Sequence, residues 1–335
     1  MSFVRLFTTI TVLVSSLSMP LMAAELNIYS ARKEALIKPL LNEFSQETGI
    51  KVNLITGKAD GLITRMRSEK MLSPADLLLT TDVGRLVRAK SFGLTQPIEL
   101  SNLSNLYIHD PNGHWVALTK RTRPIIVNPE KVAADAILTY EDLTKAEYKG
   151  RICVRSSNNV YNQSLVAAML IQQGEEKTLE WAKGLVANFA RTPKGGDRDQ
   201  IQAVAAGICD IAIINTYYLA AMLNSEGDSA KAAQKVQVVW PNQDDRGTHI
   251  NISGVAIAKY AKNITEAQRL IAFMLRPSSQ KWYSEVNQEY PVVPGIEWSK
   301  TLKEMGEFKA ESVDLEQVGH LNPKALKIMD KAGWL

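Results

Sequence analysis

The chain contains few of the residues that most often build catalytic and metal centres. Its 335 residues include only 2 cysteines and 4 histidines. No two histidines are spaced as i,i+3 or i,i+4, which argues against a zinc site made of histidine and cysteine ligands. The sequence also lacks the GxSxG, HExxH, GxxxxGK[ST], GxGxxG and CxxC patterns. We therefore expect a protein that is not an enzyme, although the carboxylates of Glu34, Asp197 and Asp199 leave an exported enzyme as one alternative.

The chain also lacks an excess of charge of either sign. It has 39 Lys and Arg against 35 Asp and Glu, a formal net charge of +4. Nucleic-acid-binding proteins concentrate basic residues, so this balance disfavours a nucleic acid as partner. With 45% hydrophobic residues the chain is long enough to bury the cores of two domains.

A long apolar stretch occurs only at the start of the chain. One basic residue, Arg5, precedes the uncharged residues 6–21, and Met22-Ala23-Ala24 supplies small residues for cleavage. This layout is typical of a secretory signal peptide, here residues 1–24, with a mature chain beginning near Glu25. No later window offers about 18 uninterrupted apolar residues, so we expect no stable membrane insertion. The sequence predicts a soluble protein of the periplasm.

The two cysteines, Cys153 and Cys209, each lie in an apolar, strand-like run. In an oxidising compartment such a pair more often forms a disulfide than two thiols. We expect a disulfide, with two buried thiols as the alternative.

The order of predicted elements indicates an α/β fold. Short strands alternate with helices over residues 26–93 and again over 150–240, which favours mostly parallel sheets with helices on both faces. Extended segments at 115–128 and 249–258 bracket the second block, so the chain leaves one lobe and later returns to it. We expect two lobes joined by two strands with a cleft between them: residues 25–120 plus 250–335, and residues 121–249. Pro323 is expected to open the last helix.

Three tyrosines supply the strongest functional signal. Tyr161 follows the predicted strand 151–155, and Tyr217 and Tyr218 follow the predicted strand 210–214, all at helix starts. In an open α/β sheet these positions lie at the carboxyl ends of strands, where ligands bind. Phenolate oxygens are hard anionic donors, and a helix N-terminus favours negative charge. Three such donors suit ferric iron better than the metals that prefer sulfur or imidazole.

The sequence resembles the periplasmic ferric-iron-binding proteins of ABC importers. The resemblance rests on Ala24-Glu25-Leu26-Asn27-Ile28-Tyr29-Ser30-Ala31-Arg32, Val160-Tyr161-Asn162, Gly196-Asp197-Arg198-Asp199-Gln200-Ile201 and Asn215-Thr216-Tyr217-Tyr218. It implies the two-lobe type II periplasmic binding protein fold, in which the lobes close about a two-strand hinge over an ion in the cleft. It further implies that Tyr161, Tyr217 and Tyr218 bind Fe³⁺ and that the partner is an inner-membrane permease. We expect a monomer.

One departure from the family is informative. Many relatives carry a histidine after the Ser-Arg of the first strand, where this chain has Lys33-Glu34. The chain is thus similar to the subgroup in which an anion such as carbonate or bicarbonate completes the iron's ligands. Arg32 and Arg121 are the candidates to hold the anion, and Arg198 is the candidate to orient a tyrosine. Glu34 is an alternative direct ligand.

The main competing interpretation keeps the fold and changes the ligand. An importer protein for thiamine, a polyamine or a phosphonate would use the tyrosines as an aromatic box around an organic cation, or an arginine cluster without a metal.

Overall fold

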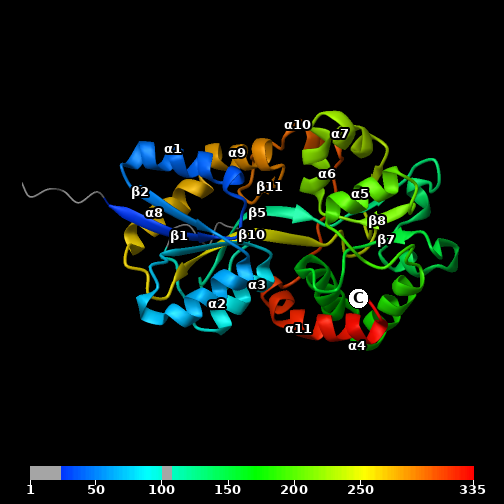
Figure 1. The fold of residues 1–335 in the computed structure, drawn as a ribbon, viewed down its shortest axis with the longest axis horizontal. Coiled ribbons are helices and arrows are strands. Elements are labelled where there is room, and N and C mark those ends of the chain that lie inside the picture. The colour runs from blue at the N-terminus through cyan, green and yellow to red at the C-terminus, as the bar shows by residue number, and fades with distance from the viewer. Residues whose placement is uncertain (1–23, 100–107) are drawn as a thin grey trace, which may run out of the picture.

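The computed structural model describes residues 24–99 and 108–335, and it contains two β-sheets, each flanked by helices (Figure 1). Residues 1–23 of the expected signal peptide lie outside the described residues. The first sheet has seven strands, in the order β11-β5-β10-β3-β1-β2 with β4 beside β10, and the second has four, in the order β7-β8-β6-β9. The strands are β1 (Glu25–Ser30), β2 (Lys51–Thr56), β3 (Leu77–Thr81), β4 (Thr95–Gln96), β5 (Val116–Thr122), β6 (Ile125–Val127), β7 (Ile152–Cys153), β8 (Ile211–Ile213), β9 (Gln237–Val239), β10 (Ile250–Ala258) and β11 (Tyr290–Pro291).

The helices lie on both faces of each sheet. Among the described residues, no helix is both long and apolar enough to span a membrane. The α-helices are α1 (Lys38–Thr48), α2 (Ala59–Glu69), α3 (Val83–Ser91), α4 (Val160–Ala187), α5 (Asp197–Ala205), α6 (Thr216–Leu223), α7 (Gly227–Gln234), α8 (Ile264–Leu275), α9 (Pro277–Asn287), α10 (Lys300–Glu304) and α11 (Leu315–Ala332). Short 3₁₀ helices are η1 (Glu34–Leu36), η2 (Lys70–Leu72), η4 (Ala134–Ala136), η5 (Glu141–Thr144) and η6 (Ala146–Tyr148).

Alternating side chains divide the core of the first sheet into two layers. Ile28 on β1 and Leu79 on β3 pack with α1, α8 and α9, whereas Tyr29 and Leu78 pack with α2 on the other face. Successive residues of a strand point to opposite faces, so a strand buried on both faces is apolar throughout. This explains the run of three leucines that opens β3.

The second sheet is built in the same way. Ile125 and Ile213 pack on the face that α4 covers, and Ile126 and Ala212 pack on the face that α5 and α6 cover. The disulfide joins Cys153 in β7 to Cys209, two residues before β8, with 5.9 Å between the Cα atoms. The pairing expected from the sequence is therefore present, and it lies in the core of this sheet.

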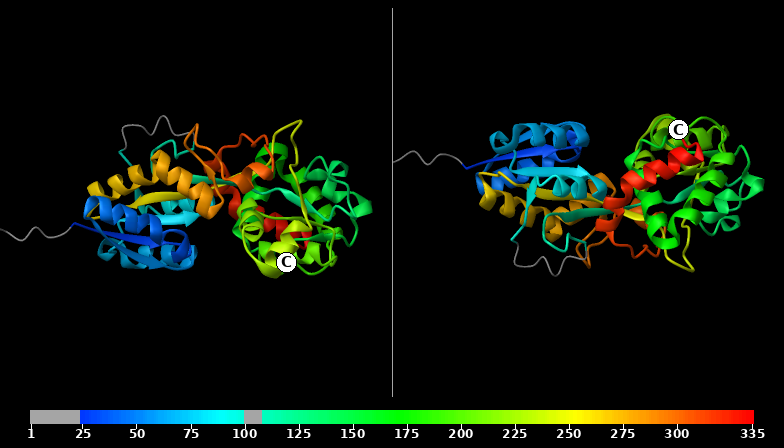
Figure 2. Two further views of the ribbon diagram at one scale, coloured as in Figure 1. Left: turned by 90° about the horizontal axis from the view of Figure 1, so that it is seen from above. Right: turned by 90° about the horizontal axis from the view of Figure 1, so that it is seen from below.

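Two extended segments connect the sheets, as the sequence predicts. The chain passes from β5 in the first sheet to β6 in the second, and it returns along β10, which pairs with β5 (Figure 2). The prediction of mostly parallel sheets is wrong. β1 pairs in parallel with β2 and β3, but β10 pairs antiparallel with β3 and β5, because the returning strand is inserted beside β3 in the opposite direction.

One expected pair of helices is present and the last helix differs from expectation. The two helices expected between residues 165 and 189 lie within α4, which breaks at Gly174, where φ is +82°. The last helix begins at Leu315, capped by the Asp314 side chain, so Pro323 lies inside the helix and does not open it. Asp314 accepts two backbone N–H groups, which makes it a stronger start signal than the proline.

Helix α11 packs on both α4 and α3, so the end of the chain touches helices of both sheets (Figure 1). The Trp334 ring, just after α11, packs against Trp181 and Phe189 beside the second sheet. The lobe limits given above place all of residues 250–335 with the first lobe; they stay a prediction.

Candidate metal centre

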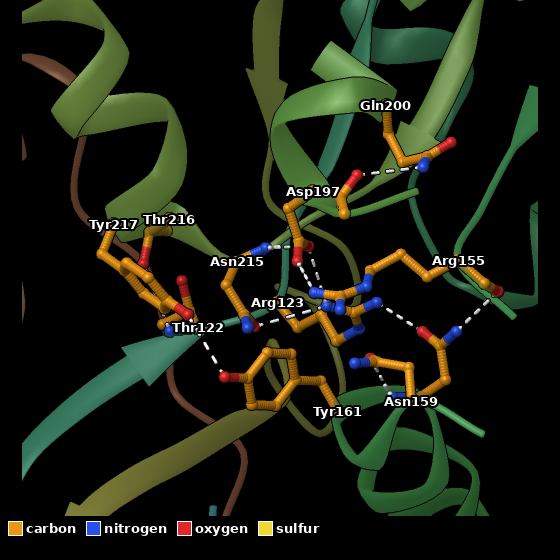
Figure 3. A network of polar contacts seen from close by, with 12 residues as sticks. Thr122, Arg123, Arg155, Asn159, Tyr161, Asp197, Gln200, Asn215, Thr216 and Tyr217 are labelled. Carbon is orange, nitrogen blue, oxygen red and sulfur yellow. Dashed lines mark hydrogen bonds and ion pairs between the residues drawn. The ribbon is translucent and has the colours of Figure 1, made fainter. Parts of the chain in front are cut away.

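The three predicted tyrosines come together at the starts of two helices of the second sheet. Tyr161 is the second residue of α4, and Tyr217 and Tyr218 are the second and third residues of α6. The Tyr161 and Tyr217 hydroxyl oxygens lie 3.3 Å apart (Figure 3). The Tyr217 and Tyr218 ring centroids lie 4.2 Å apart. All three side chains are half-buried. The structure therefore assembles three phenols within one small volume.

Arginine side chains surround these phenols. The Arg121 guanidinium lies over the rings of Tyr161, at 5.3 Å, and Tyr217, at 5.8 Å. Arg155 lies 5.6 Å from the Tyr161 ring, and Arg198 lies 5.9 Å from the Tyr218 ring. The positive charge stabilises a phenolate over a phenol at this place.

The environment sets the order in which the phenols lose protons. Burial alone would raise the pKa of Tyr161, but the Arg121 charge and hydrogen bonds with Thr81 and Tyr217 lower it below its ordinary value. Burial and the neighbouring phenols raise the pKa of Tyr217 well above its ordinary value, and burial raises that of Tyr218. Tyr161 is thus the first phenol to ionise, and the other two need a cation to replace their protons.

Arg121 is held rigidly from the first sheet. It lies on β5, is fully buried, and donates to the Ser253 hydroxyl, at 3.1 Å, and to the Ile252 carbonyl on β10. Its position on a connecting strand places a first-sheet cation against second-sheet phenols.

Arg32 contacts a carboxylate and not the tyrosines. Its guanidinium donates to both oxygens of buried Glu289, at 3.0 and 3.2 Å. Burial would raise the pKa of Glu289, but Arg32 and Arg121 hold it below its ordinary value. Glu289 also accepts from the Ser253 hydroxyl at 3.2 Å, so Arg32 is linked to Arg121 through this pair.

A buried polar network that the sequence did not predict supports the tyrosines. Arg123 lies between Asp197, at 3.2 Å, and the Asn162 side chain, next to Tyr161 (Figure 3). Asp197 also accepts from Arg155, at 2.6 Å, and from the Asn215 backbone N–H, at 3.0 Å, just before α6. The Asp197 carboxylate therefore holds the start of α6 directly and the start of α4 through Arg123. Asp197 belongs to a segment that carries the family resemblance, but nothing in the sequence marks Arg123.

The other candidate carboxylates are engaged elsewhere. Glu34 is exposed and pairs with Lys38 at 2.6 Å, and Asp199 accepts from the Gly196 backbone N–H. Over residues 24–99 and 108–335, no group of three or more histidine, cysteine or carboxylate side chains is arranged to hold a metal ion. Within the described residues, the tyrosine cluster is therefore the place where hard anionic oxygen donors converge.

Buried hydrogen-bond donors remain unsatisfied beside the cluster. Arg121 Nε and Asn215 Nδ2 have no partner among the described residues, and neither has the Thr122 hydroxyl. A buried donor without a partner costs about 1–3 kcal/mol. Such donors fit a ligand that presents acceptor oxygens, such as a small anion.

Known proteins that are similar to this chain share both its length and its fold. Residues 73–310 match the family described as bacterial extracellular solute-binding protein. The iron uptake protein A1 of Synechocystis sp. is 46% identical over 92% of this chain and 87% of that protein. The structure of the Trichodesmium protein (IdiA, FutA) in complex with iron and citrate is 44% identical, with a TM-score of 0.90 over 93% of this chain and 100% of that one. The apo ferric ion-binding protein A of Pasteurella haemolytica is 43% identical, with a TM-score of 0.88 over 93% and 98% of the two chains. These similarities confirm the predicted two-lobe type II periplasmic binding protein fold.

Proposed function

Because this chain belongs to the bacterial extracellular solute-binding protein family, we propose that it is the ferric-iron-binding protein of an ABC importer. Tyr161, Tyr217 and Tyr218 bind one Fe³⁺ ion through their phenolate oxygens. The observation that carries this proposal is the 3.3 Å approach of the Tyr161 and Tyr217 hydroxyls under the Arg121 guanidinium.

A small anion such as carbonate completes the coordination of the ion. Three phenolates balance the charge of Fe³⁺ but leave part of its coordination shell open. Arg121 is the residue best placed to hold the anion, because it is a fixed cation with a free buried Nε beside two of the phenols. Asn215 Nδ2 offers a second donor. Arg32 supports Arg121 through Glu289, Arg198 orients Tyr218, and Glu34, exposed and paired with Lys38, is not a ligand in this arrangement.

The same arginines disfavour an organic cation such as thiamine or a polyamine. Each tyrosine ring already has a guanidinium within 6 Å of its centroid. A second cation stacked on these rings would face like charges at short range. An organic anion such as a phosphonate meets no such repulsion, so it remains the alternative that the experiment must separate.

The test is a visible absorption titration of the mature protein with chelated ferric iron, with and without bicarbonate. We expect a phenolate-to-iron charge-transfer band that saturates at one equivalent. Tyr217→Phe is expected to weaken the band and lower the affinity by at least about tenfold, because it removes one charged ligand. Tyr260→Phe is the matched control, since Tyr260 is an exposed tyrosine outside the cluster. The absence of a band in the wild type would contradict the proposal.

Arg121→Gln tests the anion. The variant keeps the three phenols but removes the fixed charge, so we expect weaker binding and a loss of the dependence on bicarbonate. An Arg198→Gln variant, which changes a cation over Tyr218 only, should keep that dependence. An equal response of wild type and Arg121→Gln to bicarbonate would assign the anion to other residues.

The location and partner follow from this function. The protein acts as a monomer in the periplasm after removal of its signal peptide, and it delivers iron to an inner-membrane permease.

A further inference from the structure

Asp82 combines an unusual backbone conformation with complete burial of its charge. It directly follows β3 and has φ = +83°, in the left-handed region that non-glycine residues seldom adopt. Its side chain is fully buried, and burial raises its pKa. Both features cost free energy, and such residues persist where the surrounding structure holds them in place for a function.

Neutral donors from several elements hold the Asp82 carboxylate. Oδ1 accepts from the Gly84 backbone N–H at 2.9 Å, and Oδ2 accepts from Asn251 Nδ2 on β10 at 2.8 Å. The Asp82 backbone N–H donates to the Ile252 carbonyl at 2.8 Å. These bonds fix Asp82 to the first sheet and to the returning strand β10.

The remaining hydrogen-bond donor to Asp82 comes from α4, which packs on the second sheet. The Ser164 hydroxyl on α4 lies 2.9 and 3.0 Å from the two carboxylate oxygens of Asp82. Ser164 stands three residues after Tyr161, so the two share one face of the first turns of α4. The Tyr161 hydroxyl itself lies 3.5 Å from the Thr81 hydroxyl. Two consecutive residues at the end of β3 thus contact two residues on one face of α4.

We propose that Asp82 and Ser164 are positioning residues for iron binding. Through this hydrogen bond the first lobe holds the start of α4, so that the Tyr161 phenol stands against Tyr217 before the ion arrives. The inference rests on the proposed function, since it assigns Tyr161 as an iron ligand. Preorganised ligands bind more tightly because less freedom is lost on binding.

The chemistry of the site requires a carboxylate at position 82. Asn251 cannot reverse its amide, because its Oδ1 accepts from the Val83 and Ile252 backbone N–H groups at 2.9 and 2.7 Å. An asparagine at position 82 would therefore direct its own NH₂ group at either the Gly84 N–H or Asn251 Nδ2, donor against donor. Only a group with two acceptor oxygens satisfies both donors and Ser164.

The decisive variant is Ser164→Ala, which removes the donor that α4 supplies to Asp82 and leaves in place the bonds that Gly84 and Asn251 donate to it. The matched control is Thr178→Ala on the same helix. Thr178 is also fully buried, but its hydroxyl donates only within the helix, to the Gly174 carbonyl. Iron affinity is measured by competition with a chelator, the charge-transfer band by visible absorption, and stability by thermal unfolding of the iron-free protein.

We expect Ser164→Ala to lower iron affinity by about tenfold, which corresponds to about 1.4 kcal/mol, and to alter the position or intensity of the band. Thr178→Ala should lower stability to a similar extent while its affinity stays within about twofold of wild type. Asp82→Asn should reproduce the loss of affinity if circular dichroism shows it folded. Wild-type affinity and an unchanged band in Ser164→Ala would overturn this inference. A wild-type protein that forms no band would instead refute the proposed function.

Discussion

At the scale of single residues, the chemistry of the centre depends on where positive charge stands relative to three phenols. Arg121 is fixed by two hydrogen bonds and lies over two of the rings. Its charge offsets the burial that would otherwise keep Tyr161 protonated, whereas Tyr217 and Tyr218 keep raised pKa values. In the iron-free centre Tyr161 therefore loses its proton more readily than Tyr217 and Tyr218, which hold theirs until a metal displaces them.

This protonation state predicts how iron affinity depends on pH. The raised pKa values of Tyr217 and Tyr218 mean that both phenols are protonated at neutral pH and must release protons when the ion binds. Affinity should therefore fall as the pH falls, by about tenfold per pH unit for each proton released. Chelator competition at several pH values measures the slope.

The control for this pH dependence is Tyr217→Phe, which has one phenolic proton fewer to release and should show a shallower slope than Tyr260→Phe. Equal affinity of the wild-type protein across the same pH range would mean that the phenols do not ionise on binding.

At the scale of elements, the pairing of β7 with β8 is short and is accompanied by a covalent link. β7 has two residues and β8 has three, and they pair through only two residues each. The disulfide lies beside these strands and joins two residues that are 56 positions apart in the sequence. It links β7, which leads into α4, to the residues just before β8, which leads into α6. Such a cross-link restricts the unfolded chain and so stabilises the fold.

We predict that the double variant Cys153→Ala/Cys209→Ala loses about 2–4 kcal/mol of unfolding free energy. Thermal or denaturant unfolding of the iron-free protein measures the loss, and wild-type protein in reductant should behave similarly. The folded double variant should still form the charge-transfer band at one equivalent, because neither cysteine is a proposed ligand. A band lost together with the disulfide would show that the link also positions the site.

At the scale of the whole molecule, the two sheets contribute different parts of the centre. The proposed ligands all begin helices of the second sheet, while Arg121 on β5 and Thr81 at the end of β3 reach them from the first. In the proposed centre the second sheet therefore supplies the ligands, and the first sheet supplies charge and contacts beside them.

Amide hydrogen exchange tests this division. Ferric iron with bicarbonate should slow exchange at the first turns of α4 and α6 and also at residues 79–84, because closure reduces local opening in both lobes. The double variant Tyr217→Phe/Tyr218→Phe should show neither effect. Slower exchange confined to the second lobe would mean that the first lobe takes no part in holding the ion.

The sequence predicted much of this arrangement because its strongest signals are local. Apolar runs and helix periodicity predicted the strands and helices near their observed positions, and the turns after β7 and β8 indicated the three tyrosines. The direction of the strands could not be predicted from the sequence, because β10 joins the first sheet only after the chain has formed all strands of the second sheet. The prediction that Pro323 begins the last helix was wrong, because α11 packs on α3 and α4 along its length and stays helical across the proline.

The sequence by itself determined the α/β class, and residue types and the order of elements predicted the two-lobe organisation, the disulfide pair and the position of the three tyrosines, while the family resemblance implied that they are ligands. Only the tertiary structure decided which arginines reach the phenols, that Arg32 is bound to Glu289, and that Asp82 meets Ser164. The Arg32–Glu289 and Asp82–Ser164 contacts join residues that are 257 and 82 positions apart in the sequence. Their distances depend on how the two sheets pack, and no local pattern in the chain encodes that packing.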